Sequence, residues 1–450
     1  MLWLLIPMSF ALVYRRGSFN EISLAAYVFS LGIAWVFYAR DQFQISQVSI
    51  RWVLGALPLL FFIRDPLIYA RADLNSFKIP LLIAVLSISI SQLFRGKSFS
   101  IPLQLFGTLG IALMVFLVPW FSPRPWIDVY VVQYESAEAL LDGKNPYAIE
   151  YTDIYRRGKK PRQRNALYYP YPPLTLLFNV AGYLAGDTRF AFITLHLLSG
   201  VLLYLIARNL SITRPLDWFS LWMLLPVGPF FAEQAWNDSL VVFLFALVAF
   251  LQSRRRDDLA QWGIGFLFAA KQSALGFAPL LLFPTLSKWL KAGSWDPKAI
   301  VRLALPFYVT FGAFAAIDFP NLIRGTITYH VGTPFRPDGL TIGALFFRLG
   351  GSIPSGVWSP IVLLSTSVIC FYSIYRRGFR PDRWFIAMGL VYWSTLLVSK
   401  HAFCNYYYTV HFLLILGCLG GASNSSRRWT IPVTHSEAAA SPMQSRIKAG

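Results

Sequence analysis

Residues 101–121 read IPLQLFGTLGIALMVFLVPWF, a run in which no residue carries a charge. A helix needs about 20 apolar residues to cross roughly 30 Å of hydrocarbon, and this run is long enough to do so. Within lipid the backbone must satisfy its hydrogen bonds inside the segment, so the run should be helical. The sequence therefore predicts a membrane-spanning helix directly before the longest polar stretch of the chain.

Similar apolar runs lie on both sides of 101–121 and indicate the fold class. We expect an all-α polytopic membrane protein with about 11–14 spanning or re-entrant helices. The other candidate spans are residues 22–39, 79–94, 190–207, 218–231, 239–252, 264–283, 300–317, 357–375, 384–399 and 406–421. The runs 1–14 and 52–63 are shorter, and 52–63 is expected to lie in the membrane interface or to re-enter.

The composition agrees with a surface covered by lipid. Hydrophobic residues make up 56% of the chain and charged residues only 14%, whereas about 25% of the residues of a soluble protein are charged. The net charge of +19 does not indicate a nucleic-acid partner, because no basic surface domain exists to bind one. Lys and Arg instead collect in the cytoplasmic loops of membrane proteins, and the clusters 254–256, 376–377 and 427–428 each follow an apolar run.

The arginine clusters also predict an orientation. If they are cytoplasmic, four polar segments face outward: 121–172, 233–238, 319–341 and 400–406. Lys271 joins them if residues 264–283 form a hairpin broken at Lys271. With 52–63 in the interface, residues 15–16 and 95–97 are both expected on the cytoplasmic side. Five separate segments meeting on one side predict a functional site there.

These predictions divide the chain into four parts. Residues 1–100 are membrane helices of unassigned role, and residues 101–172 are a spanning helix followed by a long outer loop. Residues 173–421 form a helical core with a second outer loop at 319–341. Residues 422–450 are predicted to be a disordered cytoplasmic tail.

The outer loop 123–173 holds eight tyrosines and an acidic residue close to the membrane. Asp128 follows the span 101–121 directly, and a partly desolvated carboxylate there gains basicity and can deprotonate a hydroxyl. The same position also suits an acid that interacts with a helix N-terminus, and both interpretations stay open. Residues 130–141 fit a short amphipathic helix that ends at the turn 142–143.

Several residues follow one another in a recognisable order through this loop and beyond it. They are Asp128, Tyr130, Ala137, Leu140, Gly143-Lys144-Asn145-Pro146-Tyr147 and Tyr171-Pro172-Pro173-Leu174. Two further stretches are Gly263, Gly265 and Ala269-Ala270-Lys271-Gln272 with Pro279, and KHAFCNYY at 400–407. The pattern resembles GT-C class integral-membrane glycosyltransferases. It is most similar to the polyprenol-phosphate-mannose-dependent mannosyltransferases of glycosyltransferase family 87, and also resembles the catalytic subunit of the first mannosyltransferase of the GPI pathway.

The resemblance implies a GT-C-like fold and an outward-facing, inverting transferase. Such an enzyme takes a hexose, mannose in the family, from a polyprenyl-phosphate sugar and passes it to a lipid or glycan acceptor. We expect it in the plasma (inner) membrane of a bacterium, with the site facing the periplasm or exterior. The family's general base is an Asp in the first outer loop, and Asp128 is the matching position. The GPI enzymes have two acids where this chain has one, so no metal ligand is assigned, no cofactor is expected, and a divalent cation stays open without being indicated.

Cationic and imidazole side chains on the outer side are the candidates to bind the donor phosphate: Lys271, Lys400, His401, His330 and Arg336. An ionisable group inside a span is a functional candidate by default, although Lys271 equally fits a buried ion pair with Glu233 or Asp238. Aromatic and amide side chains can stack on and orient a sugar. The candidates for that role are Tyr130, Asn145, Tyr147, Tyr169, Tyr171, Asn237 and Asn405, and for Asn237 helix capping is the alternative.

The chief alternative function is that of a transporter or flippase for a lipid-linked sugar. Transporters tend to have inverted repeats and polar residues at mid-bilayer, and neither is visible in this sequence. An enzyme that moves a whole oligosaccharide, or an inactive subunit, would present the same outer groups. The chain has no HExxH, P-loop or dinucleotide-binding motif, which favours a lipid-carried donor over a sugar nucleotide. The expected partners are the donor, the acceptor and membrane lipids, with no nucleic acid.

Overall fold

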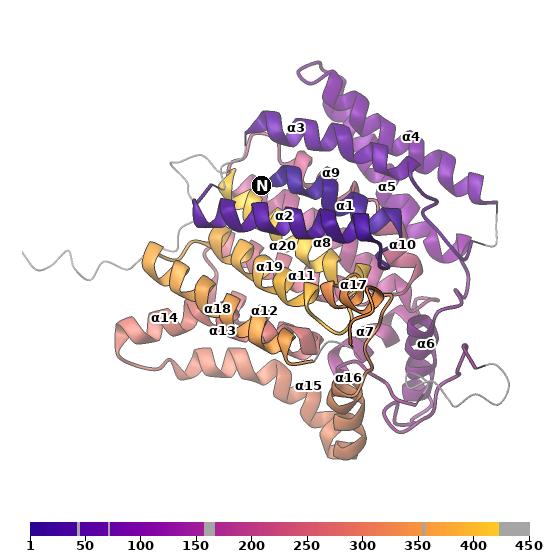
Figure 1. The fold of residues 1–450 in the computed structure, drawn as a ribbon, viewed down its shortest axis with the longest axis vertical. Helices are drawn as coiled ribbons and strands as arrows, with labels where there is room; N and C mark the ends of the chain where they lie inside the picture. Colours follow the sequence, from indigo (N-terminus) through magenta and orange to yellow (C-terminus); the bar gives the residue numbers. More distant parts are fainter. Residues whose placement is uncertain (43–45, 71–72, 157–166, 353–355, 423–450) are drawn as a thin grey trace, which may run out of the picture.

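The computed structural model describes residues 1–42, 46–70, 73–156, 167–352 and 356–422, and its regular structure is helical throughout these ranges (Figure 1). The first helices are η1 (Leu2–Leu4), α1 (Leu5–Tyr14), α2 (Glu21–Ala39), α3 (Gln47–Ala56), η2 (Leu57–Phe62), α4 (Leu74–Leu93), α5 (Ser100–Phe121) and α6 (Asp128–Leu141). The middle of the chain forms α7 (Pro173–Leu184), α8 (Arg189–Asn209), α9 (Leu216–Met223), α10 (Gly228–Glu233), α11 (Asp238–Ser253), α12 (Asp257–Ala270), η4 (Gln272–Phe277), α13 (Ala278–Leu281) and α14 (Phe283–Ala292). The last helices are α15 (Pro297–Ile323), the π-helical turn η5 (Arg324–Thr328), α16 (Tyr329–Val331), α17 (Ile342–Arg348), α18 (Trp358–Arg377), α19 (Pro381–Leu397) and α20 (Cys404–Gly421).

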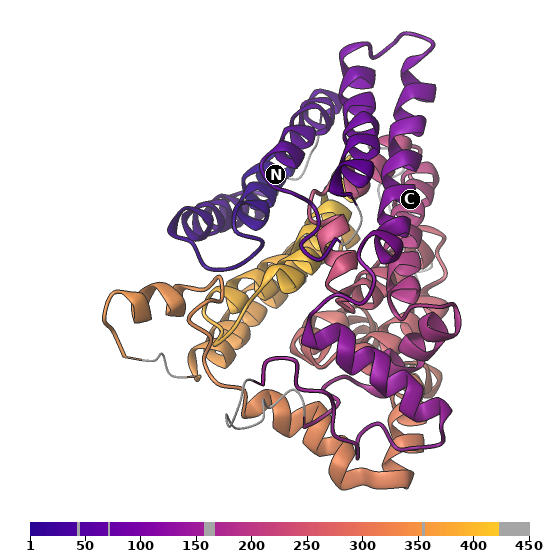
Figure 2. The same cartoon turned by 90° about the vertical axis from the view of Figure 1, so that its right-hand side faces the viewer.

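Within the described residues, six helices are long and apolar enough to cross a membrane. They are α2, α4, α5, α8, α18 and the continuous helical run Pro297–Val331, which joins α15, η5 and α16. Figure 1 shows them side by side with the shorter helices, and Figure 2 shows the same bundle from its right-hand end. The predicted all-α multi-pass membrane fold is therefore confirmed.

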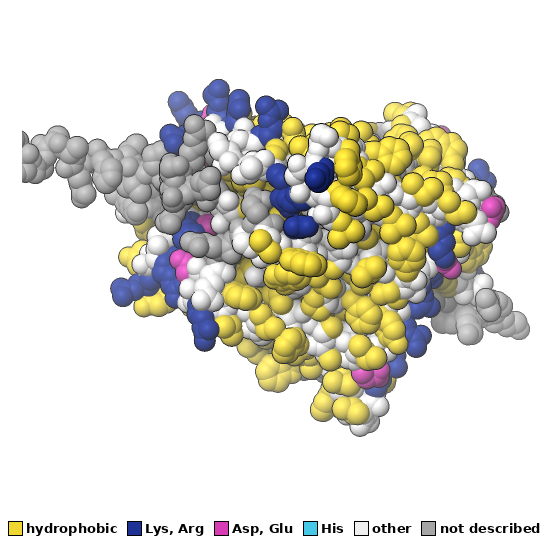
Figure 3. All heavy atoms as spheres, turned by 90° about the horizontal axis from the view of Figure 1, so that it is seen from above, with side chains coloured by type: hydrophobic (Ala, Val, Ile, Leu, Met, Phe, Trp, Pro, Cys, Tyr) yellow, Lys and Arg dark blue, Asp and Glu magenta, His cyan; other side chains and the backbone are white. Residues whose placement is uncertain are grey.

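The surface of α4 shows why the bundle needs lipid around it. Five of its large apolar side chains are exposed, and they recur at the spacing of one helix face: Ile79, Ile83, Leu86, Ile90 and Leu93. The neighbouring α5 exposes a similar stripe. In Figure 3 hydrophobic side chains cover much of the face that is drawn, and Lys and Arg gather largely toward its edges. A stripe of this kind is stable against acyl chains and costly against water.

The two ends of the bundle differ in character. One end, here called the basic end, carries Arg95 between α4 and α5, residues 254–256 between α11 and α12, and residues 376–377 at the end of α18. The other end, the loop end, carries residues 122–156, 167–172, 233–238, 332–341 and 398–403 (Figures 1 and 2). The described residues of the four segments predicted to face outward do lie together at the loop end.

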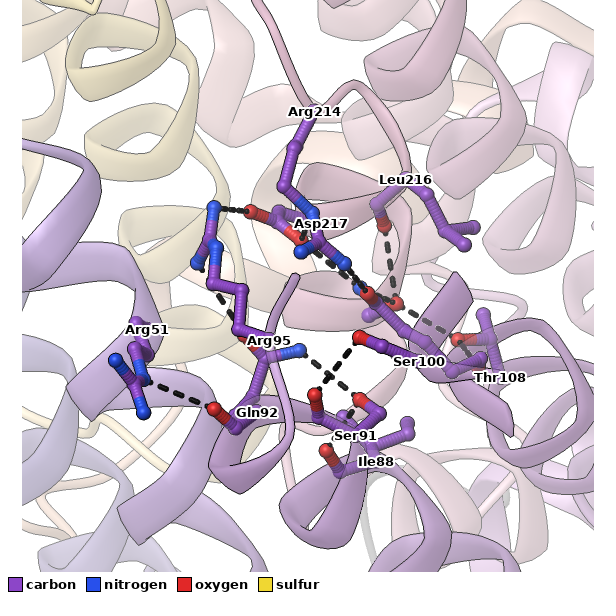
Figure 4. A network of polar contacts seen from close by, with 12 residues as sticks. Arg51, Ile88, Ser91, Gln92, Arg95, Ser100, Thr108, Arg214, Leu216 and Asp217 are labelled. Carbon is purple, nitrogen blue, oxygen red and sulfur yellow. Dashed lines mark hydrogen bonds and ion pairs between the residues drawn. The ribbon is translucent and has the colours of Figure 1, made fainter. Parts of the chain in front are cut away.

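A network of hydrogen bonds and ion pairs lies at the basic end (Figure 4). The carboxylate of Asp217 accepts hydrogen bonds from Arg95 Nη2 at 2.9 Å and from Gln104 Nε2 at 3.0 Å. Arg214 Nη2 donates to the side-chain oxygen of Gln104 at 2.9 Å, and Arg51 Nε donates to the backbone oxygen of Gln92 at the end of α4. Because buried charges are stable only when they are paired and hydrogen-bonded, this network fixes α3, α4, α5 and α9 to one another.

The N-terminal topology differs from the expected one. Arg51 contacts the end of α4 next to Arg95, whereas Arg64 Nη1 donates to Tyr14 O at the end of α1, so α3 and η2 together run from the basic end to the loop end. Arg16 lies at the loop end, where its Nη2 donates to Asp65 O at 3.1 Å. The prediction that residues 15–16 and 95–97 share a face is therefore wrong.

The geometry of η2 explains this error. The ten residues of α3 and the six of η2 span about 27 Å, because a 3₁₀-helix rises about 2.0 Å per residue against 1.5 Å in an α-helix. That length is close to the hydrocarbon thickness of about 30 Å. The helix therefore crosses because it begins at Gln47, five residues before the predicted run 52–63, and because the 3₁₀ geometry of η2 adds about 3 Å.

The N-terminal helices pack into the rest of the bundle. Trp35 Nε1 on α2 donates to Ser394 Oγ on α19 at 3.2 Å, and the rings of Tyr27 and Tyr407 lie 4.3 Å apart. The described helices of residues 1–100 therefore form part of the same core as the later helices. The predicted tail 422–450 falls, apart from Ala422, outside the described residues.

The α4–α5 contact depends on a glycine. A Cβ atom added at Gly107 would lie 2.4 Å from the backbone oxygen of Ala84, so the two helices approach closely in the manner of small-residue packing in membranes. A Cβ atom added at Gly312 on α15 would have no atom within 4 Å.

We expect Gly107→Ala to lower stability by roughly 1–3 kcal/mol, because the methyl group forces α4 and α5 apart. Gly312→Ala is the matched control, and it should be neutral or stabilising, since Ala forms helices better than Gly. Apparent melting temperatures of the purified proteins in detergent measure both effects. Equal melting temperatures for the two variants would contradict the close α4–α5 contact.

Candidate functional site

Asp128 is the first residue of α6, which follows α5 after a short turn. Its side chain is partly buried and lies at the loop end. The charge of Asp128 acts on Tyr155, Tyr171 and Arg336, which come from three separate segments. Burial first, and then the Asp128 carboxylate, raise the pKa of Tyr155 to about 12. The fold therefore surrounds the predicted base with phenol hydroxyls and a guanidinium, and it also places this acid in the first turn of a helix, where the helix dipole favours a negative charge.

Lys271 lies at the tip of a broken hairpin, as expected. α12 ends at Ala270, Lys271 is extended, and the chain returns through η4, α13 and α14. The return brings Lys288 Nζ within 2.8 Å of Asp257 Oδ2 at the start of α12. The break thus places a lysine between two helical segments near the loop end.

The ammonium group of Lys271 is held by polar partners. Its Nζ lies 2.5 Å from Asp238 Oδ1 and 3.3 Å from Asn237 Oδ1. The second carboxylate oxygen of Asp238 accepts from Asn405 Nδ2 at 3.1 Å, and the ring of Tyr406 lies 5.3 Å from Nζ. Of the two roles weighed for Lys271, the buried ion pair is present in this structure, and its partner is Asp238 and not Glu233. Asn237 and Asn405 both belong to the same cluster.

Gln272, the residue after Lys271, joins three segments of the site. Its Nε2 donates to Pro170 O and to Thr326 O, both at 2.8 Å. The ring of His330 bonds the same Pro170 oxygen through Nε2 at 2.7 Å. A Cβ atom at Gly325 would lie 2.3 Å from Tyr169 O, so a glycine is needed where η5 meets this loop. The first part of the expected outer loop 319–341 is therefore helical, and the irregular part begins after Val331.

Lys400 and Arg336 connect the loop 332–341 to the loop 398–403 by hydrogen bonds. Lys400 Nζ donates to His330 O at 2.9 Å and Val331 O at 2.8 Å, while Arg336 N donates to Lys400 O at 2.9 Å. The Arg336 guanidinium binds both oxygens of Asp338, at 2.8 and 2.7 Å, and its carbon lies 5.0 Å from the Phe403 ring centre. Lys400 therefore serves as a cap for helix carbonyls, and Arg336 keeps a fixed orientation beside Asp128.

His401 is neutral at neutral pH in this fold. Burial first, and then the positive charge of Lys400, lower the pKa of His401 to about 4. Its Nδ1 atom is buried and has no hydrogen-bond partner among the described residues. The neutral imidazole can offer a hydrogen bond to a phosphate but no positive charge.

Four of the predicted sugar-binding residues hold the outer loop in shape. Tyr147 and Tyr169 are buried in a small apolar core, where Tyr147 donates to Tyr171 O at 2.8 Å and Tyr169 OH accepts from Asn179 Nδ2 at 2.6 Å. Asn145 Nδ2 donates to Asp318 Oδ2 at 3.3 Å, at the kink of α15. Tyr130 is buried with the Arg189 guanidinium 5.0 Å from its ring centre. Of the predicted tyrosines, Tyr171 is the one whose surroundings include Asp128.

Three further tyrosines belong to the site and were not predicted. Tyr155 lies near Asp128, Tyr406 near Lys271, and Tyr69 near both Asp128 and Glu233. Glu233 is fully buried and accepts the backbone N–H groups of Ile68 at 2.7 Å and Tyr69 at 2.8 Å. This carboxylate therefore attaches the N-terminal segment to the site. No pattern around Tyr69 or Tyr155 distinguishes them from other loop tyrosines, because tertiary packing brings them here.

The described residues contain no group of three or more His, Cys, Asp or Glu side chains that could hold a metal ion. Comparison of the chain with protein-family models, with curated proteins and with solved structures finds no match. The function therefore has to be inferred from the site's own residues.

The low pKa of His401 predicts a pH dependence of stability. Its ordinary value is 6.5 and its folded value about 4, so between these values the unfolded chain binds more protons than the folded one. Stability then falls as pH falls through this window. His401→Gln should remove roughly 1–3 kcal/mol of that loss between pH 6.5 and 4. Apparent melting temperatures across this range test it, and parallel wild-type and variant curves would contradict it.

Proposed function

We propose that this chain is a membrane glycosyltransferase with a GT-C-like fold. It moves a hexose, mannose by resemblance, from a polyprenyl-phosphate sugar to a hydroxyl of a lipid or glycan acceptor. The observation that carries the proposal is the convergence at the loop end of one carboxylate, Asp128, with Arg336 and the aromatic hydroxyls of Tyr155 and Tyr171. The Lys271 cluster adjoins them through Tyr171 and Tyr406.

The chemistry assigned to Asp128 is that of a general base. Its carboxylate takes the proton of the acceptor hydroxyl while the hydroxyl oxygen forms a bond to C1 of the sugar. The bond from C1 to the phosphate oxygen breaks at the same time, so the configuration at C1 inverts and the negative charge stays on the polyprenyl phosphate. A charge that develops on phosphate is stabilised by positioned cations and N–H donors.

Lys271 is suited to stabilise the negative charge on the phosphate even though it already forms an ion pair with Asp238. An ammonium group has three N–H donors, and Asp238 and Asn237 accept two of them. The third is available to a phosphate oxygen, with Asp238 fixing the direction of the side chain. Arg336, oriented by Asp338, is the second cation assigned to the phosphate.

The orientation proposed follows from the basic end. Because Lys and Arg collect on the cytoplasmic side, the basic end is assigned to the cytoplasm and the loop end to the outside, the periplasm of a bacterial inner membrane. A donor carried by a polyprenyl lipid reaches such a site by lateral diffusion within the bilayer.

A transporter or flippase for a lipid-linked sugar is the second candidate, and the buried Lys271–Asp238 pair favours it, because paired charges inside helical bundles are common on transport pathways. Reconstitution into vesicles with a panel of labelled polyprenyl-phosphate sugars distinguishes the two. A transferase forms a labelled product or releases the sugar by hydrolysis, whereas a flippase moves intact donor between leaflets.

Asp128→Asn should reduce sugar transfer by at least about 100-fold, the contribution typical of a general base. The matched control is Asp142→Asn, which removes an exposed carboxylate from the turn after α6 and should leave turnover unchanged. Gel filtration and melting temperature verify that both variants fold. Turnover retained by Asp128→Asn would exclude the base assignment.

Lys271→Gln should raise the KM for the donor about tenfold and leave the acceptor KM unchanged. Because this variant leaves Asp238 as an unpaired buried charge, it also loses stability, by about 3–5 kcal/mol. The double variant Lys271→Gln with Asp238→Asn removes that charge and should recover stability while the donor KM stays high. If the double variant also recovers the donor KM, Lys271 has no role at the phosphate.

A further inference from the structure

Arginines occur at the loop end, where the rule that places basic residues at the opposite, basic end does not expect them. Arg16 follows α1 and Arg64 follows η2, and the two side chains line one small cavity together with Asp65. Apolar side chains from α1, η2 and α10, including Leu12, Phe61 and Phe230, form its walls. The cavity thus combines two guanidinium groups with an apolar surface.

The two guanidinium groups are held close to one another by backbone contacts. Arg16 Nη2 donates to Asp65 O at 3.1 Å, and Arg64 Nη1 donates to Tyr14 O at 2.7 Å. Burial and then the neighbouring Arg64 lower the pKa of Arg16. Two like charges so arranged repel each other, and the nearby carboxylates of Glu233 and Asp65 offset part of that repulsion.

The carboxylates near Arg16 are occupied elsewhere. Asp65 Oδ1 lies 2.7 Å from Lys78 Nζ, and the oxygens of Glu233 accept the N–H groups of Ile68 and Tyr69. Arg16 Nε is buried and has no hydrogen-bond partner among the described residues. A donor that is buried without a partner costs about 1–3 kcal/mol unless a ligand or water accepts from it.

The residues beside the cavity suit the level of lipid headgroups. Leu59, Phe62 and Ile63, directly before Arg64, are exposed large hydrophobic residues, so this part of η2 faces acyl chains. An arginine at the end of a lipid-facing helix reaches the phosphate layer of the membrane. Arginine is also the side chain best suited to phosphate, because its guanidinium offers paired N–H donors.

We propose that Arg16 and Arg64 form a binding site for the phosphate group of an anionic phospholipid, whose acyl chains lie against the exposed Leu59, Phe62 and Ile63. The phosphate accepts from the buried Arg16 Nε and offsets the repulsion between the two guanidinium groups. Tyr69 links this site to the proposed base, since both Arg16 and Asp128 act on it. The bound lipid would therefore border the region around Asp128, and the site stands whether or not Asp128 transfers a sugar.

The test uses the full-length chain in neutral detergent, titrated with short-chain phosphatidylglycerol, short-chain phosphatidylcholine or inorganic phosphate. Native mass spectrometry measures lipid retention, and the shift in melting temperature measures all three ligands. We expect phosphatidylglycerol to bind best, and Arg64→Gln and Arg16→Gln each to weaken it about tenfold, the effect of losing one charge-assisted hydrogen bond. Arg64 is exposed, and its guanidinium donates to the backbone oxygen of Tyr14, so its variant keeps the test valid if Arg16→Gln fails to fold.

The matched control is Arg15→Gln, which removes the same charge from the adjacent, exposed residue that does not line the cavity. It should retain wild-type affinity for phosphatidylglycerol. Equal weakening by Arg15→Gln would overturn the proposal, because it would reduce the effect to general charge attraction. Binding of phosphatidylcholine as strong as that of phosphatidylglycerol would overturn it as well, and inorganic phosphate binding equally well would overturn the assignment to a lipid.

Discussion

The ion pair between Lys271 and Asp238 is the interaction on which the loop end of this protein depends. Lys271 interrupts an apolar hairpin, and an ammonium group there is stable only with a carboxylate beside it. Asp238 begins α11 and also binds Asn405 at the start of α20. One pair of charges thus sets the height of the hairpin tip relative to two core helices. Gln272, the next residue, then fixes the outer loop and η5 to the same tip.

Beyond the hairpin tip, the loops are connected by hydrogen bonds from side chains to backbone oxygens. Pro170 O accepts from Gln272 and is hydrogen-bonded to the ring of His330. Lys400 then donates to the backbone oxygens of His330 and Val331. Asp128, at the start of α6, lies near the same loops but belongs to a different helix. Most of the polar side chains named at this site already bind a neighbouring residue. The chemistry proposed for the site therefore relies on a small number of groups held in fixed directions.

The parts of the fold that the sequence predicted well are those governed by the hydrocarbon. Uncharged runs long enough to cross it became helices, α6 appeared where residues 130–141 are amphipathic, and the hairpin broke at Lys271 because a charge there cannot continue an apolar span. The parts that could not be predicted depend on contacts distant in sequence. Arg16 was placed on the wrong side because counting residues does not reveal that η2 is 3₁₀. Tyr147 and Tyr169 are aromatic residues that could stack on a sugar, but they are buried in a small core. The sequence alone cannot distinguish a tyrosine that binds a sugar from one that packs in a core.

The mixed helix formed by α3 and η2 is longer than an α-helix of the same residues would be. If the six residues of η2 wound from 3₁₀ into α geometry, the segment would shorten by about 3 Å. That change is comparable to the difference in hydrocarbon thickness between cellular membranes, to which spanning helices otherwise adapt by tilting. Because Arg64 lies two residues after η2, a change in the winding of these two turns would change the depth of its guanidinium relative to the membrane surface. Hydrophobic mismatch would then be absorbed locally, without tilting the helices that carry the site.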